Sequence, residues 1–197
     1  MAQTNDRQPL YDCLAALQEV FDEFGNRAVI IGGIAVGLLA RPRATLDVDA
    51  MMLLDVAQVG RLLEVAREHG FLPRISEADD FARRSRVVLL KHERTGISVD
   101  ISLGMLPFET EVVSRAVRCK AGPVSVTLAS PEDLVILKAV AHRPMDLLDI
   151  RSIIEAHPNL DAGRVERWVR EFAEALEMPE IWEDIAAWFD RPAESAP

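Results

Sequence analysis

The stretch that decides the fold reads IIGGIAVGLLARPRATLDVD and spans residues 30–49. It continues an unbroken apolar run that begins at Ala28, which is typical of a strand buried on both faces. The glycine pair turns the chain, and the apolar segment after it predicts a short helix. At its end, Asp47 and Asp49 alternate with apolar residues as in a second strand. The expected nucleus of the fold is therefore a strand, a glycine turn, a helix and an acidic strand.

The glycine pair has two interpretations. Gly32 and Gly33 would let backbone N–H groups at the helix start approach an anion closely, and the helix dipole would add to the attraction. They therefore suit phosphate binding. A Gly-Gly turn between a strand and a helix is more often plain chain geometry, so the pair taken alone is weak evidence for phosphate binding.

The acidic strand points more directly to a metal. Asp47 and Asp49 lie on the same face of a strand, with attachment points about 6.6 Å apart. Carboxylates at that separation can bridge two cations that lie roughly 3.5–4 Å apart. The alternative is a solvated edge strand, although Asp is a poor strand former. A third ligand would decide between the two.

Residues 97–103, ISVDISL, supply a candidate for that ligand. Their apolar residues share one face, and Asp100 shares the other face only with Ser98 and Ser102. If this strand lies beside the first acidic strand, three carboxylates meet. Such an oxygen-rich site suits a hard divalent cation such as Mg²⁺.

A later helix carries a cation on its apolar side. Ser130-Pro131-Glu132-Asp133 is a strong helix start, with Ser as N-cap, Pro at the first helical position and acids in the first turn. Lys138 falls on the apolar stripe of this helix. Such lysines usually extend to the surface; beside a glycine turn and three acids, contact with a triphosphate is the better interpretation.

The ordered set resembles the nucleotidyltransferases of the DNA polymerase β-like superfamily, whose pattern is a glycine-pair turn, an Asp-x-Asp strand and a third Asp on a later strand. The segments RATLDVD (43–49), SPEDLVILK (130–138) and RPMDLLDI (143–150) resemble the AbiE-type toxin nucleotidyltransferases. The resemblance covers roughly residues 28–154. The chain departs from it at Gly33, where many members have Ser, and at Met145, where relatives often carry Lys.

The resemblance implies an α+β fold with a small mixed sheet flanked by helices. We expect the nucleotidyltransferase core over residues 1–129, a helical lobe closing the nucleotide cleft over residues 130–190, and a disordered tail over residues 191–197.

The implied reaction is transfer of a nucleoside monophosphate from an NTP to a hydroxyl acceptor, with tRNA or protein as acceptor and an antitoxin as possible partner. Asp47 and Asp49 would hold two Mg²⁺ ions, and Asp100 would complete the second site and act as general base. Nucleotide contacts would come from Gly32, Gly33, Arg43, Thr45 and Lys138, with Arg43 and Thr45 either binding phosphate or supporting the acidic strand. A small-molecule nucleotidyltransferase of the antibiotic-modifying kind and an inert nucleotide-binding module remain alternatives.

Composition limits these choices. The net charge of −10 argues against a broad, non-specific nucleic-acid surface. Local basic segments lie at residues 83–86 and 115–120, and a solvated strand edge protected by charge is the favoured interpretation of each. The sequence has no apolar run that could span a bilayer and no signal-peptide pattern at its start, so we expect a cytoplasmic protein in which Cys13 and Cys119 are reduced.

The remaining elements follow from periodicity and caps. We expect helices over residues 9–24 and 55–69, strands over residues 86–92 and 97–103, a second strand pair over residues 112–119 and 124–128, and two amphipathic helices near the C-terminus.

Overall fold

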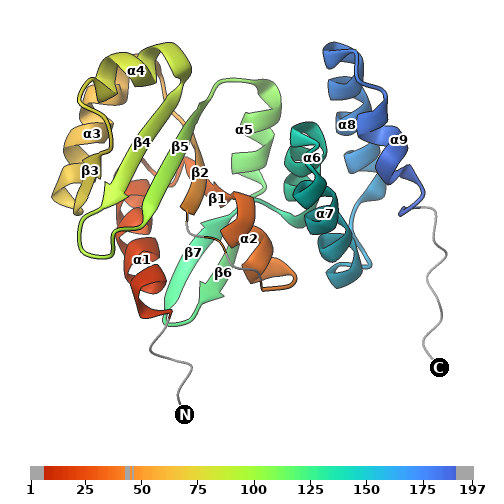
Figure 1. The fold of residues 1–197 in the computed structure, drawn as a ribbon, viewed down its shortest axis with the longest axis horizontal. Coiled ribbons are helices and arrows are strands. Elements are labelled where there is room, and N and C mark those ends of the chain that lie inside the picture. Colours follow the sequence, from red (N-terminus) through yellow and green to blue (C-terminus); the bar gives the residue numbers. More distant parts are fainter. Residues whose placement is uncertain (1–6, 43–44, 46, 190–197) are drawn as a thin grey trace. The chain divides into compact units, whose positions relative to one another are not determined.

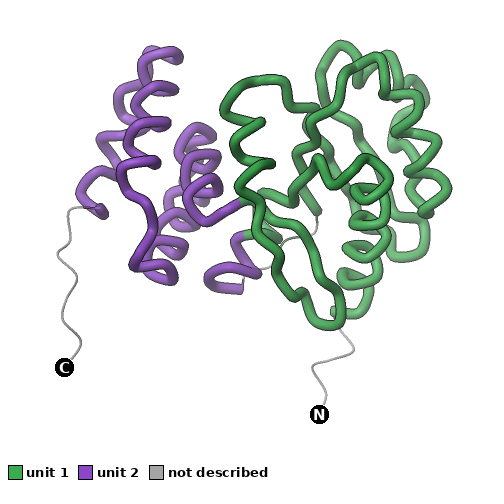
Figure 2. Tube along the Cα trace, turned by 180° about the vertical axis from the view of Figure 1, so that it is seen from behind, with its two compact units in different colours: residues 1–35, 44–129 green, residues 36–43, 130–197 purple. Residues whose placement is uncertain are grey.

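The computed structural model describes residues 7–42, 45 and 47–189, which form two compact units. Unit 1 comprises residues 1–35 and 44–129, and unit 2 comprises residues 36–43 and 130–197 (Figure 2). The division falls within helix α2 (Gly32–Leu39). The tail expected over residues 191–197 lies outside the described part of the chain.

Unit 1 is built on a mixed sheet, in which the described residues form seven strands in the order β3-β4-β5-β2-β1-β7-β6 (Figure 1). β1 pairs parallel to β7 and β2 pairs parallel to β5, whereas all other neighbours are antiparallel. The strands are β1 (Ala28–Ile31), β2 (Asp47–Leu53), β3 (Phe71–Pro73), β4 (Val87–His92), β5 (Ser98–Gly104), β6 (Val117–Ala121) and β7 (Val124–Leu128).

Helices cover this sheet and complete its core. Helix α1 (Gln8–Glu23) packs against β7, α3 (Val59–Glu68) against β3, α4 (Ala78–Ser85) against β4, and α5 (Pro107–Ser114) against β2 and β1. On β2 the side chains of Val48, Ala50 and Met52 are fully buried, and they alternate with the two aspartates. The acidic strand therefore contributes one face to the core and the other to the candidate site.

Most expected elements are confirmed, but two segments differ. Residues 112–114, expected to begin a strand, belong to α5, and β6 starts only at Val117. Pro107 occupies the first helical position, and the Glu109 carboxylate accepts the N–H groups of Met105 and Leu106 at 2.6 and 2.8 Å. These caps favour the helix. The basic run at residues 83–86 ends α4 rather than lying on a strand, because acids in its first turn allow an Arg83–Asp79 pair one helical turn apart.

The predicted cap residues are confirmed at two other helix starts. The carboxylate of Asp55 accepts the N–H of Ala57 at 2.7 Å, although the first turn is a 3₁₀ helix (Val56–Gln58) that precedes α3. The hydroxyl of Ser130 accepts the N–H of Asp133 at 3.1 Å.

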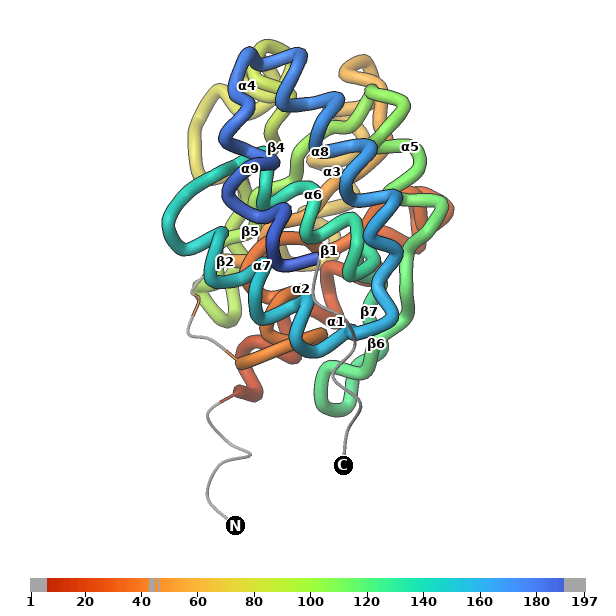
Figure 3. Tube along the Cα trace, turned by 90° about the vertical axis from the view of Figure 1, so that its right-hand side faces the viewer, coloured from red at the N-terminus to blue at the C-terminus, as the bar shows by residue number. Residues whose placement is uncertain are grey.

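Unit 2 is helical (Figure 3). Its helices are α6 (Pro131–Ala141), α7 (Pro144–Ala156), α8 (Ala162–Leu176) and α9 (Glu180–Ala186). A buried ion pair between Asp133 and Arg164, 2.6 Å long, joins α6 to α8. The end of α2 belongs to the same unit, where the Leu39 carbonyl lies 2.8 Å from Nε2 of His157. None of the described helices has the length and apolar character needed to cross a membrane.

Candidate active site

The sheet brings the predicted carboxylates to neighbouring strand positions. β2 and β5 pair in parallel, with Asp49 opposite Asp100 and Asp47 opposite Ser98. Neighbouring strands lie about 4.8 Å apart, and paired residues point to the same face. The adjacency on which the three-carboxylate hypothesis depended is therefore present.

The glycine turn belongs to the same place. Ile31, the last residue of β1, pairs with Asp49, and Gly32 follows with φ +67°. A Cβ added to Gly32 would lie 2.8 Å from both Cβ and Cγ of Asp49, closer than real side-chain contacts allow. Glycine is thus required at this position for both its backbone angle and its missing side chain. The Asp49 side chain lies directly against the turn, and Gly33 is buried behind it in α2.

Asp100 has an arginine partner that no sequence pattern predicted. The Nη2 of Arg74 donates to Oδ1 of Asp100, and both side chains are about one-third exposed, at 30% and 37%. Partial burial raises the pKa of the Asp100 carboxyl, and nearby Asp47 adds to this, whereas Arg74 acts in the opposite direction. No local pattern marks Arg74, because it lies between a short strand and a helix and reaches Asp100 only through the sheet.

The residues between α2 and β2 are described only in part. The Thr45 hydroxyl donates to the backbone carbonyl of Asp47 at 3.4 Å, and its contact with a nucleotide stays a prediction. Arg43, the other predicted nucleotide contact of this segment, lies outside the described residues.

Lys138 lies in unit 2 and has partners there. Its Nζ is 2.7 Å from Oδ1 of Asp146 and 2.9 Å from Oδ2 of Asp149, and all three side chains are nearly buried. These ion pairs connect α6 to α7. In these pairs the two carboxylates offset the charge of Lys138, which gives the lysine a structural role. The contact of Lys138 with a triphosphate stays a prediction.

The carboxylates of the sheet suit a divalent cation in donor type. Within the described part of the chain, no three His, Cys, Asp or Glu side chains are grouped so that they could hold a metal ion as they stand. Asp47, Asp49 and Asp100 nevertheless offer only oxygen donors from one face of two paired strands, which is the chemistry that Mg²⁺ prefers. The cation that Asp100 now faces is Arg74.

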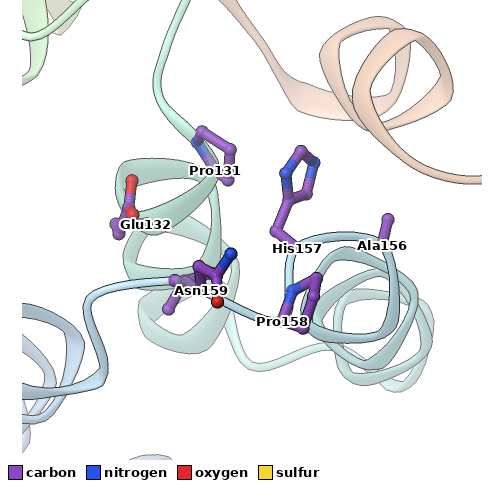
Figure 4. A pocket seen from close by; sticks show the side chains of 7 residues that line it. Pro131, Glu132, Ala156, His157, Pro158 and Asn159 are labelled. Carbon is purple, nitrogen blue, oxygen red and sulfur yellow. The ribbon is translucent and has the colours of Figure 1, made fainter. Parts of the chain in front are cut away.

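Two hollows formed by described residues lie within unit 2. One, of about 320 Å³, is lined by residues of α6 and the α7–α8 connection (Figure 4). Its His157 is already hydrogen-bonded to the Leu39 carbonyl. The other, of about 420 Å³, includes the exposed Met145, which stands where the resemblance led us to expect a lysine.

Comparison with known proteins identifies the fold. The chain is 17% identical to the antibiotic-resistance factor ANT(2'')-Ia, with a TM-score of 0.58, covering 92% of this chain and 98% of that one. An antigenic nucleotidyltransferase-like protein from Paracoccidioides brasiliensis is 18% identical, with a TM-score of 0.55 over 94% of this chain and 93% of that one. A structure of ANT(2'')-Ia in complex with adenylyl-2''-tobramycin matches with 19% identity and a TM-score of 0.52 over 82% and 95% of the two chains. The expected α+β nucleotidyltransferase fold is confirmed.

Comparison by sequence gives a family. The model of the family described as "nucleotidyltransferase of unknown function (DUF6036)" matches residues 9–190. No functionally curated protein matches the sequence.

Proposed function

We propose, since this chain belongs to the nucleotidyltransferase family DUF6036, that it moves a nucleoside monophosphate from an NTP to a hydroxyl acceptor in a reaction that needs Mg²⁺. One observation supports this proposal above all others. The Asp49 side chain lies against Gly32 and also stands opposite Asp100 on the neighbouring strand. The glycine turn and a pair of strand carboxylates therefore lie beside one another.

The residues of the site would have separate roles in binding phosphate and metal. Backbone N–H groups of Gly32 and Gly33, at the start of α2, would hold phosphate oxygens. Asp47, Asp49 and Asp100 would hold two Mg²⁺ ions. When bound, these ions would neutralise charge on the triphosphate and make the acceptor hydroxyl more acidic.

Asp100 would accept the hydroxyl proton as general base. The hydroxyl oxygen then forms a bond to the α-phosphorus, the bond from that phosphorus to the β-phosphate oxygen breaks, and pyrophosphate leaves. Its place opposite Asp49 on the neighbouring strand would put this carboxylate beside the bound acceptor.

The acceptor is tRNA or protein if the chain acts as the AbiE-like segments at residues 43–49, 130–138 and 143–150 suggest. In that case the enzyme is of the toxin type, and a partner antitoxin protein would neutralise it. This version predicts that expression of the active protein slows growth of the host cell.

A small-molecule acceptor is the second candidate, and the charge of the chain favours it. A net charge of −10 repels a polyanion such as tRNA but not a neutral or cationic polyol. The structure of ANT(2'')-Ia in complex with adenylyl-2''-tobramycin shows an adenylylated small molecule bound to a protein of the same fold.

The decisive experiment uses purified protein, each α-labelled NTP in turn, Mg²⁺ and a cell extract. We expect label in one fraction, RNA, protein or small molecules, and loss of that label with EDTA or with Asp49→Ala. The exposed Asp80 of α4 offers a matched control, because Asp80→Asn removes a carboxylate that does not belong to the two acidic strands and should keep full activity. Full activity of Asp49→Ala would reject the proposed metal site. Absence of Mg²⁺-dependent NTP binding would favour an inert interaction module.

A further inference from the structure

Arg74 reaches the candidate site through the order of the strands. Its N–H donates to the Leu89 carbonyl at 2.9 Å, one residue beyond the β3–β4 pairing of Pro73 with Leu90. Leu89 in turn pairs with Asp100, and Asp100 with Asp49. These four positions form a row across one face of the sheet.

Leu89 is the apolar member of this row, and it separates Arg74 from Asp100. Arg74 extends across the Leu89 position and donates to the carboxylate of Asp100. A planar guanidinium is well suited to such a contact, and it is charged at every physiological pH. Asp100 thus has a positively charged partner supplied by the chain itself.

We propose that Arg74 is a resident counter-cation of the site, which holds Asp100 in the absence of a divalent ion and competes with that ion for the carboxylate. The inference rests on the proposed function, because it takes Asp100 as a cation ligand. Arg74 acts through Asp100 and is therefore a positioning residue rather than a catalytic one.

The competition has a direct thermodynamic consequence. A cation that binds at Asp100 must displace the guanidinium or share the carboxylate with it, so part of the binding free energy is lost. The benefit is that crowding among Asp47, Asp49 and Asp100 is relieved while the site awaits its substrate. Removal of Arg74 should therefore strengthen cation binding, opposite to the effect expected of a residue that merely maintains the fold.

The test measures Mn²⁺ affinity by the loss of the free-ion signal in electron paramagnetic resonance, without nucleotide and without turnover. We expect Arg74→Gln to lower the Kd for Mn²⁺ by about three- to tenfold, the range that follows from removing a partly exposed ion pair and one nearby positive charge. Arg74→Lys should restore a Kd near that of the parent protein. Asp100→Asn should weaken binding at least about tenfold.

A matched control distinguishes loss of the Arg74–Asp100 contact from loss of one positive charge near the site. Lys91 lies on the same face of the sheet but opposite Ser98. Lys91→Gln removes the same charge without breaking the contact to Asp100, so we expect a change in Kd below about twofold. Thermal unfolding of each variant in the absence of metal verifies that it is folded.

The outcomes distinguish this inference from the proposed function. If Arg74→Gln binds Mn²⁺ no more tightly than the parent while Asp100→Asn binds it less tightly, the competition is refuted and the cation site stands. If neither the parent nor Arg74→Gln binds Mn²⁺, the cation site is refuted and the competition with it.

Discussion

At the scale of single residues, Gly32 is the position where backbone and site depend on each other most closely. Its positive φ excludes most side chains, and the Asp49 side chain fills the space that a Cβ would need. Nearby Gly25 has the same φ of +67° but open space around it. Comparing alanine replacements at the two glycines therefore separates the free-energy cost of the backbone angle from that of the contact with Asp49.

We predict that Gly32→Ala is more destabilising than Gly25→Ala and that only Gly32→Ala abolishes nucleotidyl transfer. Each replacement costs about 1–2 kcal/mol for a left-handed residue with a side chain. Gly32→Ala must also displace Asp49. Urea unfolding and the α-labelled NTP assay measure the two effects. Equal losses of stability would show that Asp49 moves aside freely.

At the scale of secondary-structure elements, the buried charges of unit 2 determine how its helices are joined. Lys138 of α6 pairs with two carboxylates of α7, and Asp133 of α6 pairs with Arg164 of α8. Breaking such a pair by removing one partner leaves an uncompensated buried charge, which usually costs about 3–5 kcal/mol. These links make α6 the central helix of the unit.

We predict that Lys138→Met lowers the free energy of unfolding by about 3–5 kcal/mol, because Asp146 and Asp149 both lose the buried ammonium group that pairs with them. The triple variant Lys138→Met, Asp146→Asn, Asp149→Asn should recover much of the loss. Urea unfolding followed by circular dichroism provides the measurement. A single variant within about 0.5 kcal/mol of the parent would contradict the structural role and favour the triphosphate contact.

At the scale of the whole molecule, the two cysteines differ in solvent exposure, so their reactivity measures how readily the folded state opens. Cys13 of α1 is fully buried in the core of unit 1, and burial raises the pKa of its thiol to about 12. Cys119 lies partly exposed on β6, the last strand of the sheet. One thiol is therefore accessible in the native state and the other only after the core opens.

We predict that a thiol reagent at pH 8 modifies one cysteine per chain quickly and the second only at the rate of unfolding, because the protonated, buried Cys13 cannot react. Cys119→Ser should remove the fast reaction, whereas Cys13→Ser should leave it unchanged. Two fast thiols in the parent protein would mean that the core around α1 opens readily.

Much of the fold follows from local sequence patterns. The alternation around Asp47, Asp49 and Asp100 predicts two strands, and the caps at Asp55 and Ser130 predict helix starts, because period and capping act over a few residues. The structure confirms these elements. The chemical character proposed for the site rests on its glycine pair and its acids.

Only the tertiary structure decided which distant groups meet. Strand order placed Arg74 on Asp100, and helix packing gave Lys138 two carboxylate partners. The segment at residues 107–114 became a helix because its proline and a capping glutamate outweighed its apolar run. The sequence by itself therefore determined the elements and the residues able to do chemistry, whereas their charge partners were set by contacts between strands and helices far apart along the chain, which no local pattern encodes.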